Sequence, residues 1–133
     1  MEKLSLWEDK EKRKINPKLF SEIAESMARN IAREGGKNKN KNSQLRRYFD
    51  EIVRLNTLST EDKDEDFWQN QILPQVHMLI AKVVYARGRD LVTESFENLI
   101  KEGIYQIEKK EDLHIFTNFL EAFMGYYKVY GPK

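Results

Sequence analysis

Cysteine is absent from this chain of 133 residues, so no disulfide, thiolate metal site or cysteine nucleophile can form. Glycine and proline are scarce, and no glycine-rich phosphate loop occurs. No apolar run approaches the roughly 20 residues that a membrane-spanning helix needs. Residues 1–14 mix acidic and basic side chains and lack the apolar core of a signal peptide. These absences predict a soluble, cytoplasmic protein that does not bind a membrane.

Histidine is also rare, which bears on catalysis and on metal binding. His77 and His114 fall on different predicted helices, and neither has a carboxylate or a second histidine at a spacing typical of zinc sites. No serine lies in a nucleophile-elbow context. The acidic residues within 61–66 lack the glycine and final glutamate of a calcium loop, and are interpreted as solvated charge at a helix start. The sequence predicts no catalytic residue, metal site or cofactor, and thus no enzyme.

Apolar residues recur at helical spacing along most of the chain, whereas alternating strand patterns are missing. The apolar stripes of the predicted helices lie within residues 20–31, 45–55, 67–83, 92–107 and 113–127. Helices joined by short connections are typical of a bundle, so the predicted fold class is all-α, a compact bundle of about five helices. The length predicts a single helical domain over residues 1–133.

Several residues predict where the helices begin and end. Asn16 and Pro17 indicate the start of the first helix, and Gly35-Gly36 its end in a left-handed turn. Pro74 either kinks the third helix or starts its main part. Residues 1–15 are highly charged and are interpreted as a loosely held N-terminal arm, or as a short helix that packs on something.

The net charge is only +1, so any electrostatic argument depends on where the charges lie. The acid-free stretch from Lys37 to Arg47 contains a predicted basic loop, residues 37–42, and a helix start capped by Ser43. Its basic residues are Lys37, Lys39, Lys41, Arg46 and Arg47. Neutral hydrogen-bond donors that can reach the phosphates or ribose hydroxyls of RNA lie between them, at Asn38, Asn40, Asn42, Ser43 and Gln44. Cations that neutralise phosphates release counterions, and a helix start favours anions. Composition alone leaves open whether this stretch binds phosphates or is a solvated linker.

A second basic cluster surrounds Tyr85 near the end of the third predicted helix. It consists of Lys82, Arg87 and Arg89. Lys82 and Arg89 share a helical face with Tyr85, although cations near a helix C-terminus also have a purely structural explanation. Arg54 follows Arg47 by two helical turns and extends one basic stripe. The tyrosines of the last helix, Tyr126, Tyr127 and Tyr130, suit either base stacking or the core, and their helical spacing favours the core.

Three segments together resemble the small subunit of type III-A CRISPR effector complexes. Residues 44–49 (Gln-Leu-Arg-Arg-Tyr-Phe), after the lysine-rich loop, match one motif of that family. Residues 82–89 match its lysine, apolar pair, Tyr-Ala and closing arginine. Phe116, Phe119, Glu121-Ala122 and Tyr126 match its C-terminal pattern, with Gly125 where alanine is expected. The resemblance covers about residues 37–128, in the family's order.

The resemblance implies a non-catalytic subunit, several copies of which line up beside the crRNA and its target RNA. It implies contacts with the large polymerase-like subunit, the backbone nuclease subunit and neighbouring copies. Lys41, Arg46, Arg47 and Arg89 are implied as the main contacts with the RNA backbone. Lys37, Lys39, Lys82 and Arg87 are implied as supporting contacts, and Gln44 as either an RNA contact or a helix cap. Two alternatives stay open: a helical scaffold without RNA contact, and the small subunit of the related type III-B complex.

Overall fold

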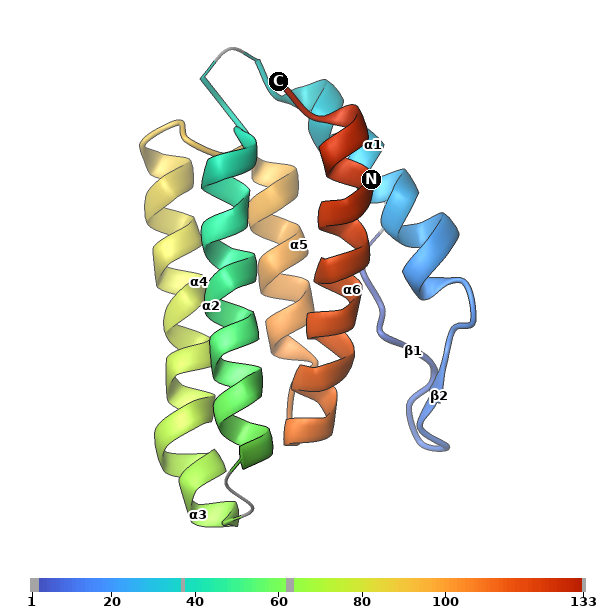
Figure 1. The fold of residues 1–133 in the computed structure, drawn as a ribbon, viewed down its shortest axis with the longest axis vertical. Coiled ribbons are helices and arrows are strands. Elements are labelled where there is room, and N and C mark those ends of the chain that lie inside the picture. Colours follow the sequence, from blue (N-terminus) through green and yellow to red (C-terminus); the bar gives the residue numbers. More distant parts are fainter. Residues whose placement is uncertain (1–2, 37, 62–63, 133) are drawn as a thin grey trace.

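The computed structural model describes residues 3–36, 38–61 and 64–132, and it confirms the predicted all-α class (Figure 1). The long helices of the described chain are α1 (Ala24–Glu34), α2 (Asn42–Glu61), α4 (Leu73–Gly88), α5 (Glu94–Tyr105) and α6 (Lys110–Tyr130). Two π-helical turns, η1 (Leu19–Ile23) and η2 (Trp68–Ile72), lead into α1 and α4, and α3 (Glu65–Phe67) is a single turn. None of the helices in the described ranges is long and apolar enough to cross a membrane.

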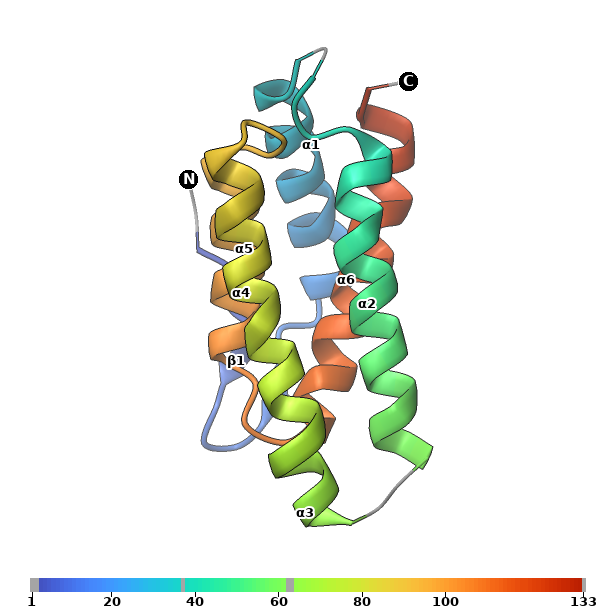
Figure 2. The same cartoon turned by 90° about the vertical axis from the view of Figure 1, so that its left-hand side faces the viewer.

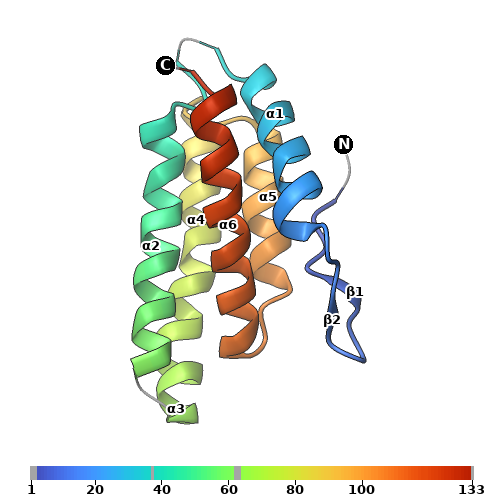
Figure 3. The same cartoon turned by 45° about the vertical axis from the view of Figure 1, so that its right-hand side comes forward.

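Helix α6 lies between α1 and α2, while α4 lies beside α5 on the other side of the bundle (Figure 3). Figure 2 shows α2 and α4 side by side on one face. The inward face of α6 carries a ladder of aromatic rings, Phe116, Phe119, Phe123 and Tyr127, all fully buried. Neighbouring rings of this ladder are three or four residues apart, which places them one above another along a helix. The ladder is the apolar stripe predicted for residues 113–127.

The N-terminal segment is ordered differently from the predicted loose arm or short helix. Strands β1 (Trp7–Asp9) and β2 (Lys14–Ile15) pair antiparallel in a small hairpin beside the bundle. Leu4 and Leu6 are buried, and their backbone N–H groups donate to Glu102 (2.8 Å) of α5 and to Gln106 (2.9 Å) directly after it. Strands this short have no stable pattern of their own, so contacts with the bundle define them.

The helix ends agree with the sequence only in part. Asn16 accepts a hydrogen bond from the Lys18 N–H (2.9 Å) ahead of η1, and Pro74 lies in the first turn of α4, so it starts the main part of that helix. Gly35 does end α1, but with extended backbone (φ −71°, ψ 167°), so the predicted left-handed turn was wrong. Helix α2 begins at Asn42, one residue before the predicted cap Ser43.

One ion pair ties the hairpin to the start of α6 and makes stability depend on pH. Burial favours the neutral form of Asp112, but hydrogen bonds from the Lys109 and Glu108 N–H groups and from Arg13 (2.6 Å) outweigh it and hold its pKa below the ordinary value. A carboxyl whose pKa is lowered in the folded state stabilises the fold above its unfolded pKa, and this contribution is lost as the pH falls through the folded pKa.

The variant Arg13→Ala is therefore expected to lower the free energy of unfolding at pH 7 by about 1 kcal/mol, allowing for the partly exposed guanidinium. The deficit should shrink as the pH falls from about 4 through the lowered pKa of Asp112, because the protonated carboxyl no longer attracts Arg13. Urea unfolding over a pH series measures this, with Lys12→Ala in the same turn as a control. An equal deficit at every pH would contradict the role given to the ion pair.

Candidate nucleic-acid interface

The basic loop is anchored at Asn40, which is fully buried and has a positive φ of 56°. Its side-chain amide donates to the Ile31 carbonyl (3.0 Å) and to Thr93 Oγ1 (2.9 Å), and accepts from the Thr93 N–H (2.9 Å). Its backbone N–H donates to the Leu91 carbonyl (2.9 Å), and its carbonyl accepts from the hydroxyl of Tyr127. Asn40 therefore joins the ends of α1, α4, α5 and α6. The prediction that it offers a free donor to RNA was wrong.

The other described residues of the loop before α2 are exposed. Lys39 is exposed and pairs with Asp90 (3.7 Å) after α4, while Lys41 is exposed directly before α2. Asn38 is also exposed, so it keeps the predicted freedom to hydrogen-bond outside the protein. Lys37, also predicted to contact RNA, lies outside the described residues.

Adjacent arginines at the start of α2 point to different faces of the bundle. Arg46 lies over the ring of Phe49 (5.9 Å to the centroid), 3.9 Å from Asp50, and lines a hollow between α2 and α6. Arg47 lines a different groove, between α2 and α4. Consecutive residues on a helix are about 100° apart, so one turn of α2 serves both faces. The sequence treated the pair as one patch, and the structure divides it.

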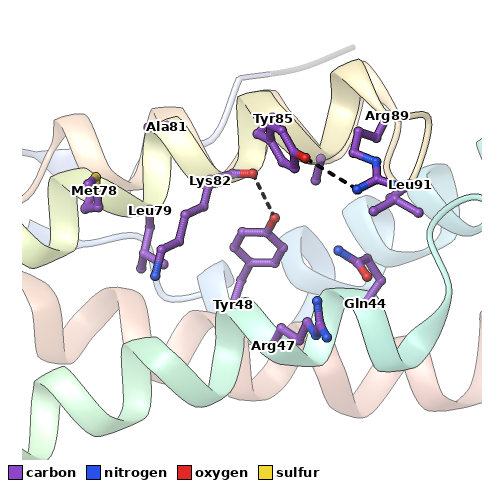
Figure 4. Close-up of a pocket in the computed structure, with 11 residues that line it drawn as sticks. Gln44, Arg47, Tyr48, Met78, Leu79, Ala81, Lys82, Tyr85, Arg89 and Leu91 are labelled. Atoms are coloured by element: carbon purple, nitrogen blue, oxygen red, sulfur yellow. Dashed lines mark hydrogen bonds between the residues drawn. The ribbon is translucent and has the colours of Figure 1, made fainter.

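The α2–α4 groove brings the motif at residues 44–49 together with the motif at residues 82–89 (Figure 4). Its volume is about 530 Å³. It is lined by Gln44, Arg47, Tyr48, Met78, Leu79, Ala81, Lys82, Tyr85, Ala86, Arg89 and Leu91. Because Leu91 also accepts the hydrogen bond from Asn40, the basic loop is attached to the end of this groove. We call this site the α2–α4 groove.

Tyr48 lies at the base of the groove and holds its two walls together. Its ring is buried and packs edge-on against Phe96, with centroids 5.5 Å apart. Its hydroxyl donates to the Lys82 carbonyl (3.2 Å), so it joins α2 to α4. Burial raises the pKa of Tyr48, which keeps the hydroxyl protonated and able to donate. Tyr48 is therefore structural.

Two of the arginines predicted to contact RNA form ion pairs with carboxylates of the protein. Arg54 donates two hydrogen bonds to the carboxylate of Glu51 (2.7 and 3.0 Å). These bonds, together with the positive charges of Arg54 and Lys82, lower the pKa of Glu51. Arg87 lies 2.5 Å from the largely buried Glu97 on α5. A buried carboxylate is costly unless it is paired, and Arg87 together with Lys101 (3.5 Å) neutralises Glu97. Both arginines are exposed, so a phosphate could still reach them, but part of their charge is already neutralised within the protein.

The cations that line the α2–α4 groove are Arg47, Lys82 and Arg89. All three are exposed, and no carboxylate of the described residues lies within ion-pair distance of them. Arg89 donates instead to the hydroxyl of Tyr85 (3.3 Å). A polyanion on this groove would meet unpaired positive charge on both walls.

The tyrosines of α6 belong to the protein interior or pair with other residues. Tyr127 is fully buried, and burial raises its pKa to about 12. Tyr126 packs against the core, and Tyr130 donates to Glu25 (2.7 Å). The structure thus favours the core interpretation for this helix. The exposed aromatic residues of the described chain lie on α4 and α5 instead, Tyr85 and Tyr105.

Sequence reasoning missed the apolar residues of the groove. Met78 is 58% exposed and Ala81 is exposed, and both line the groove together with the more deeply placed Leu79. A signal was available, since α4 carries apolar residues on nearly every face. A helix that is apolar all round is typical of a buried element, yet here one side of it stays open.

The described residues contain no cluster of three or more histidine or carboxylate side chains that could hold a metal ion. The groove itself offers groups that suit the binding of a nucleic acid. It supplies unpaired cations for phosphates, an amide from Gln44, and an exposed ring on an apolar floor.

Comparison with known proteins identifies the family to which the chain belongs. The Csm2 Type III-A family matches residues 14–133, which include both motifs of the groove. A curated relative, the "CRISPR system Cms protein Csm2" of Streptococcus thermophilus, is 27% identical over 93 residues, covering 68% of this chain and 73% of its own length. No solved structure matches the chain. Of the type III-A and type III-B families considered from the sequence, the matched family is the type III-A one. The chain therefore belongs to the Csm2 family, the small subunits of type III-A CRISPR effector complexes.

Proposed function

We propose that the protein is a non-catalytic subunit that binds the RNA backbone in a type III-A effector complex through the α2–α4 groove. The observation that carries the proposal is the meeting of Arg47, Lys82 and Arg89 in one groove, without ion-pair partners among the described residues. Lys41 and the exposed part of the loop extend this surface at the start of α2. The RNA would be the crRNA, its target, or both.

Membership of the family makes other subunits of the complex its partners. We further propose that the large polymerase-like subunit, the backbone nuclease subunit and neighbouring copies contact surfaces other than the groove. On this proposal the protein positions RNA and supports assembly, while cleavage takes place in other subunits.

A scaffold without RNA contact is the second candidate. It is favoured by exposed apolar residues on α4 and α5, namely Met78, Val84 and Tyr105. Such residues suit a protein partner. This candidate predicts no dependence of RNA affinity on the cations of the groove.

The dependence of RNA affinity on salt separates the two candidates. If about 3–5 phosphates are neutralised, log affinity for single-stranded RNA should fall with log salt concentration at a slope of roughly −2 to −3.5. Arg47→Ala should make the salt slope shallower by about 0.7 and weaken RNA binding about 5-fold at 0.1 M salt. The double variant with Lys82→Ala should change the slope and the logarithm of the affinity by twice as much. The full chain and the assembled complex should both be measured, because the isolated subunit presents only part of the surface.

Arg46→Ala is the matched control, since it removes the same side chain one position away on the other face of α2. It should cost less affinity than Arg47→Ala, because Arg46 lies outside the α2–α4 groove beside Asp50. Circular dichroism should show unchanged helix content in all variants. Equal losses for the two arginines would contradict the groove as the main contact, and no loss for either would favour the scaffold.

A further inference from the structure

The α2–α4 groove contains more than a phosphate-binding surface requires. Contacts with phosphates need cations and hydrogen-bond donors, but no exposed apolar area. This groove has an apolar floor, with the ring of Tyr85 64% exposed on the α4 wall and Met78 58% exposed nearby. Its volume of about 530 Å³ falls within the roughly 300–1,000 Å³ of pockets that enclose small organic ligands.

Tyr85 is held in place, unlike most exposed aromatic side chains. Its hydroxyl accepts a hydrogen bond from Arg89 (3.3 Å), and the guanidinium carbon of Arg89 lies 5.8 Å from the ring centroid (Figure 4). The other tyrosine of the groove, Tyr48, is only 6% exposed, so its ring is not available. One aromatic ring is therefore presented to the groove in a restrained orientation.

The cations lie around this ring rather than apart from it. Lys82 precedes Tyr85 on α4 by three residues and so shares its face of the helix. Arg89, the residue directly after α4, follows Tyr85 by four residues and reaches it by the hydrogen bond described above. Arg47 faces them from α2. A chain whose phosphates reach these cations would carry the intervening base past the ring of Tyr85.

We infer that the α2–α4 groove binds an unpaired RNA nucleotide, with its base stacked on Tyr85 and the flanking phosphates bound by Arg47, Lys82 and Arg89. Stacking of bases on aromatic side chains is the usual way in which proteins bind single-stranded nucleic acid. In an A-form duplex the bases stack on one another, so a duplex offers its phosphates but no free base face. The inference rests on the proposed function and names its substrate class as single-stranded RNA or an unpaired position within a longer RNA.

The test compares the wild-type protein with Tyr85→Ala and Tyr85→Phe on two single-stranded RNAs. One is an ordinary oligonucleotide, and the other keeps the same sugar-phosphate chain but lacks its bases. Tyr85→Ala should weaken binding to the ordinary RNA roughly 5- to 150-fold, without changing the salt slope. Tyr85→Phe should retain most of the affinity, and Tyr85→Ala should have little effect on the RNA without bases. The wild-type protein should quench the fluorescence of an RNA that contains the base 2-aminopurine, and Tyr85→Ala should not.

The outcomes separate this inference from the proposed function. Salt-dependent binding that is equally strong with and without bases would overturn the nucleotide site and leave backbone binding standing. Absence of any salt-dependent binding, in the free subunit and in the complex, would overturn both. If Tyr85→Ala weakened self-association in sedimentation experiments and left RNA affinity unchanged, the ring would belong to a protein contact and the inference would be wrong.

Discussion

Replacing Asn40 with alanine is expected to lower the free energy of unfolding by about 3 kcal/mol. The Thr93 N–H at the start of α5 would lose its acceptor inside the protein, and an unpaired buried donor costs about 1–3 kcal/mol. Alanine would also have to adopt the positive φ of 56°, which costs it about 1–2 kcal/mol. The loss is large against the 5–15 kcal/mol typical of a domain.

The matched control is Asn40→Gly, which removes the same amide but adopts a positive φ without strain. It should be about 1 kcal/mol more stable than Asn40→Ala. Urea unfolding measures the difference directly when the free energy of unfolding falls with urea concentration at the same slope in both variants. If both variants were as stable as the wild type, the loop would not be anchored through the side chain of Asn40.

Replacing Gly103 with alanine is expected to lower the free energy of unfolding by about 2–3 kcal/mol, although alanine is the better helix former. Gly103 lies within α5 against Phe116 of α6, and a Cβ atom there would overlap the Phe116 ring. Phe116 is fully buried, so its ring has no room to move without disturbing the aromatic ladder.

Gly125→Ala, in α6, is the control, because there the same substitution is expected to stabilise the protein. A Cβ atom at Gly125 meets nothing within 4 Å, and the residue is exposed. Here alanine should raise the free energy of unfolding by about 0.5–1 kcal/mol, because it loses less backbone entropy than glycine. Thermal or urea unfolding of both variants checks the pair. A destabilised Gly125→Ala would show that packing at this position matters more than helix propensity.

The sequence predicted the long helices well because each of them buries a continuous apolar stripe. In α6 the recurrence of Phe116, Phe119, Phe123 and Tyr127 places four large side chains on one face, and only a helix buries all four together. Local residue chemistry also gave two alternatives for Pro74, a kink or the start of the main part of its helix, and the structure has the start. The hairpin over residues 7–15 could not be predicted in this way, because its strands carry no periodic pattern and depend on distant contacts with α5.

For the candidate site, the sequence by itself determined which residue types were available and that they lay in two motifs, residues 44–49 and 82–89. It also predicted a loop over residues 37–42, and of these the described residues 38–41 do lie outside the helices, whereas Asn42 begins α2. It could not tell a free cation from one neutralised within the protein. Arg47 and Arg87 look alike in sequence, yet Glu97 of α5 lies beside only the second.

Only the tertiary structure decided that the two motifs meet in one groove, that Asn40 is part of the core, and that Tyr85 is exposed while Tyr48 is buried. The physical reason is that helical periodicity defines which residues share a face of one helix. It does not define which helix covers that face, and the pairing of charges and the exposure of rings depend on the covering helix.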